Sequence, residues 1–152
     1  MGFPEYAFGY LWSAMTAIGM IAPLTASFLS KKGKEKSFIL TVMIILMLIT
    51  LPVIFVYTLI PAIIILLLSL FFIYLPKPLE RTFFHKYIPS KLRATIGSIE
   101  SMVLSIAAII AAPLTGLSVD HLGPKTTIFL SAILMIPAII VFSKIQESKP
   151  QP

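Results

Sequence analysis

The chain contains no cysteine, only two histidines and only six acidic residues among its 152 amino acids. Without cysteine, a disulfide framework, a thiol nucleophile and a cysteine metal site are all excluded. His85 and His121 are too isolated in the sequence to form a metal or catalytic site, and no H-E-x-x-H motif or glycine-rich phosphate loop occurs. We therefore expect no enzymatic activity, no metal and no cofactor.

Charge is also scarce, since charged residues make up 12% of the chain and hydrophobic residues 58%, with a mean hydropathy of +1.00. Soluble domains contain about 25% charged residues, so this composition indicates a membrane protein. The net charge of +6 would suggest nucleic-acid binding in a soluble protein. In this chain the positions of the charged residues explain the positive net charge better, and no nucleic-acid partner is expected.

Five apolar segments are long enough to cross a bilayer, which takes about 20 residues each. All five should be α-helices, because lipid offers no partner to an open backbone group. The N-terminus lacks a basic stretch and leads directly into the first segment, so no cleavable signal is expected. The sequence predicts an all-α, polytopic bundle in a single membrane domain, residues 1–152, with spans near 6–29, 38–57, 59–79, 94–119 and 126–142.

Prolines occur inside four of these spans, at Pro23, Pro52, Pro113 and Pro137. Kinks at these positions would suit helices that bend during transport. Simple tolerance of proline in a membrane explains them equally well, because neighbouring groups satisfy the freed carbonyls. Pro61 instead follows a turn at Tyr57–Thr58 and lies near the start of the third span.

The basic residues predict the orientation of the chain in the cell membrane. Eleven of the twelve fall in the loop at 31–36, in the stretch from 77 to 93, or in the tail. Lys125 alone falls on the opposite side. With five spans, this distribution places the N-terminus outside and the C-terminus in the cytoplasm.

The stretch from Tyr87 to Met102 changes from a basic loop, interrupted by Pro89, into a long apolar helix. Small residues recur along that helix every three or four positions, which places them on one face. Such a face permits close packing of another helix, or it lines a cavity to which its serines are exposed. The residues are Ala94, Gly97, Ser101, Ser105, Ala108, Ala112 and Gly116.

Charged residues near the membrane are candidates for substrate binding or gating, because burying a charge in lipid costs free energy. Glu100 lies two turns into the fourth span, seven residues after Arg93, and either acts there or pairs with a loop cation at the interface. Lys77, Glu80 and Arg81 have the spacing to pair on one helix face. Solvation at a cytoplasmic helix end is the alternative. Arg93, Ser101 and Ser105 complete the candidates for substrate binding or gating.

One loop contains a G-x-x-x-D-x-x-G pattern, and a second loop contains a degenerate copy of it. Gly116-Leu-Ser-Val-Asp120-His-Leu-Gly123 lies between the fourth and fifth spans, and a degenerate copy, from Ala26 through Ser30 to Gly33 and Lys34, lies between the first and second. We expect each to form a tight turn, with glycine ending a helix and the acid capping the turn or meeting a helix N-terminus.

With these loops and the phrase Ile88-Pro-Ser-Lys-Leu-Arg93-Ala-Thr-Ile-Gly-Ser98, the chain resembles the major facilitator superfamily of transporters. The phrase is similar to the loop before the eleventh helix in the drug-efflux-like branch. The resemblance covers nearly the whole chain and implies that its spans correspond to helices eight to twelve. It further implies a small solute bound near the midplane between two six-helix halves that rock to give alternating access.

The chain departs from the family pattern, because Ala26 and Ser30 replace the glycine and aspartate of the first loop. The seventh helix and the N-terminal half have no counterpart. We therefore expect a partial or split transporter, inactive without the missing half or another membrane chain. The alternative is a small helical accessory or structural subunit of the membrane.

Overall fold

The computed structural model describes residues 5–29 and 34–145, and these residues form helices and short connections without any strand. The elements are α1 (Glu5–Leu29), α2 (Glu35–Thr50), η1 (Leu51–Phe55), α3 (Leu59–Tyr74), α4 (Lys77–Tyr87), η2 (Ser90–Leu92), α5 (Arg93–Leu122) and α6 (Pro124–Lys144). Helices α1 and α2 are consecutive in the chain but are separated in the bundle by α3, and a 3-10 turn extends α2.

Five segments of the described chain are helical, long and apolar enough to cross a membrane. This result confirms the predicted all-α bundle, and the chain has the architecture of a multi-pass membrane protein. Few of the residues in these segments are buried by the protein itself, which leaves most apolar side chains on the outside of the bundle. The segments are Tyr6–Ala26, Glu35–Phe55, Leu59–Thr82, Arg93–Leu122 and Pro124–Lys144.

The stretch predicted as a basic loop between the third and fourth spans is largely helical. Helix α3 ends at Tyr74, and α4 begins at Lys77, after the two connecting residues Leu75 and Pro76. The carbonyl of Pro76 accepts hydrogen bonds from the backbone N–H groups of Leu79 and Glu80, at 2.9 Å each. Proline near the first position of α4 favours this start, because its missing N–H is not needed there.

The prolines within the spans affect the helices in different ways. Pro23, Pro113 and Pro137 lie inside α1, α5 and α6, which continue past them. At Pro52, by contrast, α2 has ended and the chain continues as the 3-10 turn η1, in which Val53 is buried. Pro89 ends the helical stretch of α4 as expected, with Ile88 in an extended conformation.

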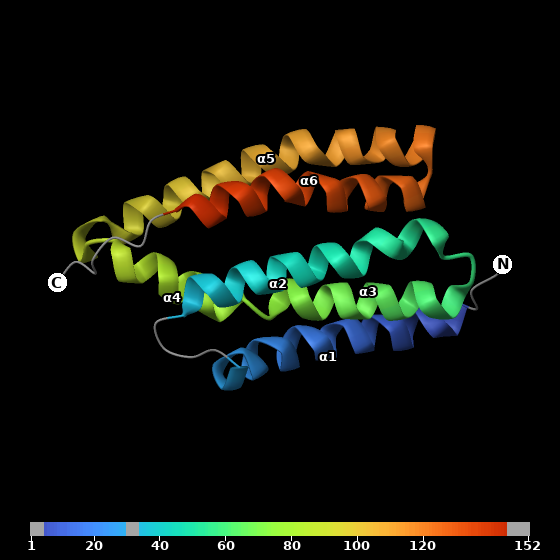
Figure 1. Cartoon of the computed structure of the whole chain (residues 1–152), viewed down its shortest axis with the longest axis horizontal. Helices are drawn as coiled ribbons and strands as arrows, with labels where there is room; N and C mark the ends of the chain where they lie inside the picture. Colours follow the sequence, from blue (N-terminus) through green and yellow to red (C-terminus); the bar gives the residue numbers. More distant parts are fainter. Residues whose placement is uncertain (1–4, 30–33, 146–152) are drawn as a thin grey trace.

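The helices lie side by side in the order α5, α6, α2, α3, α1, which differs from their order in the chain (Figure 1). Helix α2 is central and packs against α3 on one side and α6 on the other. Helix α5 lies at the edge and packs mainly against α6. No described residue of α5 is buried.

The buried core is small and lies where α1, α2 and the α3–α4 junction meet. Ala22, Ala26, Val42 and Leu75 form it, each at most 3% exposed. Larger side chains pack around these four residues, including Phe38 of α2 and the edge-to-face pair Phe71 and Phe72 of α3. The small side chains of α1 allow this helix to approach its neighbours closely, as is common between membrane helices.

Lys36 links two elements that are more than one hundred residues apart. Its ammonium donates hydrogen bonds to the carbonyls of Ser143, at 2.8 Å, and Ile145. These carbonyls belong to the end of α6, where the helix dipole favours a positive charge. The start of α2 is therefore fastened to the end of α6.

Lys36→Met should lower the free energy of unfolding by about 1–2 kcal/mol, because it removes a cation from a helix C-terminus and leaves two carbonyls without their donor. Titration with SDS in mixed micelles, followed by circular dichroism, measures this change. Lys34→Met is the matched control, because Lys34 is exposed and should change stability by less than about 0.5 kcal/mol. Equal losses in both variants would contradict the role of Lys36.

Candidate functional site

Most described basic side chains belong to elements that meet at one end of the bundle, opposite the turn between α5 and α6 (Figure 1). The start of α2, the helix α4, the start of α5 and the end of α6 all lie there. We call this set the basic end, and its residues are Lys34, Lys36, Lys77, Arg81, Lys91, Arg93 and Lys144. The sequence prediction placed these cations on one side of the membrane, and the fold brings them to one end.

Of the three charged candidates in α4, two form an ion pair. Lys77 Nζ lies 3.2 Å from Glu80 Oε2, and both side chains are well exposed. Arg81 is exposed and makes no ion pair with the described residues. An exposed pair of this kind adds little stability, so α4 presents a solvated polar surface with Arg81 available for other contacts.

Arg93 and Glu100 lie in the first part of α5, which begins at Arg93. The Nε atom of Arg93 donates a hydrogen bond to the carbonyl of Ile88, at 3.3 Å, which closes the turn before the helix. Glu100 is exposed and lies two turns farther along. Because α5 is at the edge of the bundle, its carboxylate lies on a surface that the described chain does not cover.

Ser101 and Ser105 direct their hydroxyls to their own helix. Ser101 Oγ donates to the carbonyl of Gly97, at 3.0 Å, and Ser105 Oγ donates to the carbonyl of Ser101, at 2.9 Å. Both serines are exposed. Within the described chain they therefore do not line a cavity, and their hydroxyls are already satisfied.

The small residues of α5 do not form a close helix contact inside the chain. Six of the seven are exposed, and a Cβ atom built on Gly97 or Gly116 would meet nothing within 4 Å. The prediction that this face packs tightly is therefore wrong for the chain by itself. The sequence pattern identified a face suited to packing, but the contact between α5 and α6 buries none of its residues.

The turn between α5 and α6 is tighter than the motif suggested. Helix α5 continues through Gly116 and Asp120 to Leu122, and Gly123 alone connects it to Pro124. Gly123 has φ +82°, which L-residues with a side chain rarely adopt. Asp120 is exposed in the last turn of α5 and caps neither helix, contrary to expectation. Instead, Thr127 Oγ1 donates to the carbonyl of Gly123, at 3.0 Å.

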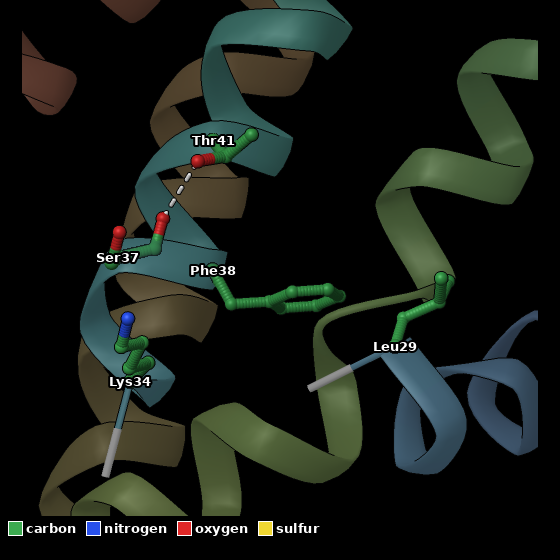
Figure 2. A pocket seen from close by; sticks show the side chains of 5 residues that line it. All are labelled: Leu29, Lys34, Ser37, Phe38 and Thr41. Atoms are coloured by element: carbon green, nitrogen blue, oxygen red, sulfur yellow. Dashed lines mark hydrogen bonds between the residues drawn. The ribbon is translucent and has the colours of Figure 1, made fainter. Parts of the chain in front are cut away.

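The degenerate copy of the motif is only partly visible, because Gly33 lies outside the described residues. Lys34 immediately precedes α2 and makes no side-chain cap. It borders a shallow hollow of about 200 Å³. Figure 2 shows the residues that line the hollow: Leu29, Lys34, Ser37, Phe38 and Thr41.

Sequence reasoning missed three contacts. Two are the bonds from Lys36 to α6, for which no local pattern gives a signal. The third is at the opposite end, where Lys125 Nζ lies 4.2 Å from the centre of the Tyr57 ring. An aromatic residue and a cation at the ends of two spans are a signal for such a contact, since a ring face attracts a cation.

One polar group inside the bundle is also unexplained by the sequence. The Ser69 hydroxyl of α3 is buried and has no hydrogen-bond partner within the described chain. Ser13 and Thr16 of α1, by comparison, donate to the carbonyls of Gly9 and Trp12 on their own helix, at 2.9 Å each. A single hydroxyl supplies too few contacts to define a solute site.

Comparison with protein-family models, curated proteins and solved structures finds no match to this chain. The site is therefore defined from the structure of this chain alone. It consists of a cationic end, an exposed helix α5 that carries the carboxylates of Glu100 and Asp120, and an opposite end where Lys125 contacts Tyr57. In the described residues no group of three metal-binding side chains is gathered. The arrangement therefore provides charged and exposed surfaces that can bind other molecules.

Proposed function

We propose that this chain is the C-terminal portion of a secondary transporter of the major facilitator type, which moves a small solute together with a second membrane chain. The proposal combines the resemblance of the loop around Arg93 with the connectivity of the bundle. The connectivity is the observation on which it mainly rests. Connectivity here means which helices pack against each other and in which direction each helix runs.

The spanning helices alternate in direction along the chain, so α2 and α6 are antiparallel, as are α1 and α5. A two-fold axis in the membrane plane would exchange helix α1 with α5 and helix α2 with α6. Helices α2 and α6 pack against each other, as expected for elements on either side of such an axis. Inverted repeats of three helices, nested in a six-helix half, are the architecture of major facilitator transporters.

The same relation assigns a place to one further helix. Helix α3 packs against both α1 and α2 (Figure 1). Its symmetry mate would pack against α5 and α6. Helix α5 has no buried residue in the described chain and presents its small residues and Glu100 outward. The face that this proposal assigns to another helix is thus uncovered and suited to close packing.

The orientation that belongs to this proposal places the basic end in the cytoplasm. Because the chain has no native cysteine, single cysteines report accessibility directly. Lys34→Cys and Lys91→Cys should react with a membrane-impermeant maleimide only after cells are permeabilised. Lys125→Cys should react in intact cells. Labelling of position 91 from outside would refute the orientation.

Transport requires two bundles that face each other across a central site. The purified chain alone in liposomes should therefore show no solute accumulation driven by an ion gradient. Reconstitution with the chain that supplies the remaining helices, sought first in an adjacent reading frame, should restore accumulation. Uptake by the chain alone, shown to be monomeric by cross-linking, would disprove the need for a partner. Absence of transport with the partner present would favour the accessory subunit.

A further inference from the structure

The basic end contains more cations than the described acids can neutralise. Lys77 is paired with Glu80, and Lys36 is bound to carbonyls of α6. Within the described ranges, Lys34, Arg81, Lys91 and Lys144 make no ion pair. Glu35 is the other described carboxylate among these helix ends. Several positive charges are therefore left for an external anion.

The hollow beside Lys34 combines this charge with apolar surface. Leu29 and Phe38 form its apolar side, and Phe38 also packs on the buried core (Figure 2). The Thr41 hydroxyl donates to the carbonyl of Ser37, at 2.8 Å. The Ser37 hydroxyl makes no hydrogen bond with described residues. One cation and one free hydroxyl thus lie next to hydrocarbon.

We propose that the basic end binds anionic phospholipid, and that the hollow beside Lys34 holds a headgroup of such a lipid. The phosphate would contact the Lys34 ammonium and the Ser37 hydroxyl, while the adjoining acyl chain would cover Leu29 and Phe38. The hollow lies at the ends of two spanning helices, which is the depth of lipid headgroups. Basic residues at this depth are attracted to anionic lipids. This inference is independent of transport.

Native mass spectrometry of the full chain, purified with equal amounts of phosphatidylglycerol and phosphatidylcholine, tests the proposal. The chain should retain phosphatidylglycerol preferentially. Lys34→Gln should lower that preference about fivefold, the effect expected of one interfacial charge. Lys34→Arg should preserve it. Lys125→Gln, at the opposite end, should leave it unchanged.

Two further measurements distinguish lipid binding in the hollow from binding elsewhere on the protein and from binding of a free anion. Arg81→Gln removes an unpaired cation of the same end outside the hollow and should have the smaller effect. Equal losses for Lys34→Gln and Arg81→Gln would overturn the assignment to the hollow. Equal retention of the two lipids, or an equal loss in Lys125→Gln, would overturn the proposal. So would displacement of the lipid by millimolar inorganic phosphate, which would identify a site for the free anion.

Discussion

Ala26→Leu should lower the free energy of unfolding by about 3 kcal/mol, the upper range for forcing extra carbons into a packed interior. Ala26 is completely buried, as is Ala22 one helical turn earlier. Both contact the cluster that contains Val42 and Leu75, so three added carbons have no space unless α1 moves away. SDS titration in mixed micelles measures the loss.

Ser105→Leu is the matched control, because it adds a similar volume to another small position on a spanning helix. Ser105 is exposed at the edge of the bundle, so its substitution should change the stability of the isolated chain by less than about 0.5 kcal/mol. In the presence of a partner chain on α5, the same substitution should weaken the complex. A loss with Ser105→Leu alone equal to that of Ala26→Leu would contradict the described packing.

These two positions show where sequence reasoning about packing succeeds and where it fails. The regular small residues of α5 predicted an interface, yet the described chain leaves them uncovered. The actual close contact uses Ala22 and Ala26, which are also spaced four residues apart. Spacing defines a face on each helix, but it contains no information about which helix covers that face. The order of helices in the bundle decides this.

The spans themselves could be predicted from the sequence, because length and hydrophobicity alone determine which segments cross a bilayer. All five predicted segments correspond to spanning helices. The helix α4 was not predicted as a separate element, because the third span was predicted to end near residue 79 and the basic residues before Arg93 were interpreted as a loop. Contacts between distant charges, such as Lys36 with the end of α6, depend on the fold and have no local pattern.

Gly123→Ala should be the second strongly destabilising substitution, with a loss of about 2 kcal/mol. Gly123 combines φ +82° with ψ 160°, a region of backbone conformation that is essentially restricted to glycine. It is also the single residue between α5 and α6, and α6 is the main contact of α5. The residue cannot relax to another conformation without separating the two helices.

Gly116→Ala provides the control for Gly123→Ala, since both add one methyl group to a glycine of the same loop motif. Gly116 lies inside α5 with open space around its Cβ position. Alanine there should stabilise the helix by up to about 1 kcal/mol, because it reduces the backbone freedom of the unfolded chain. The two variants should therefore shift the SDS unfolding midpoint in opposite directions. An unchanged or raised midpoint in Gly123→Ala would mean that the turn does not require a positive φ at this residue.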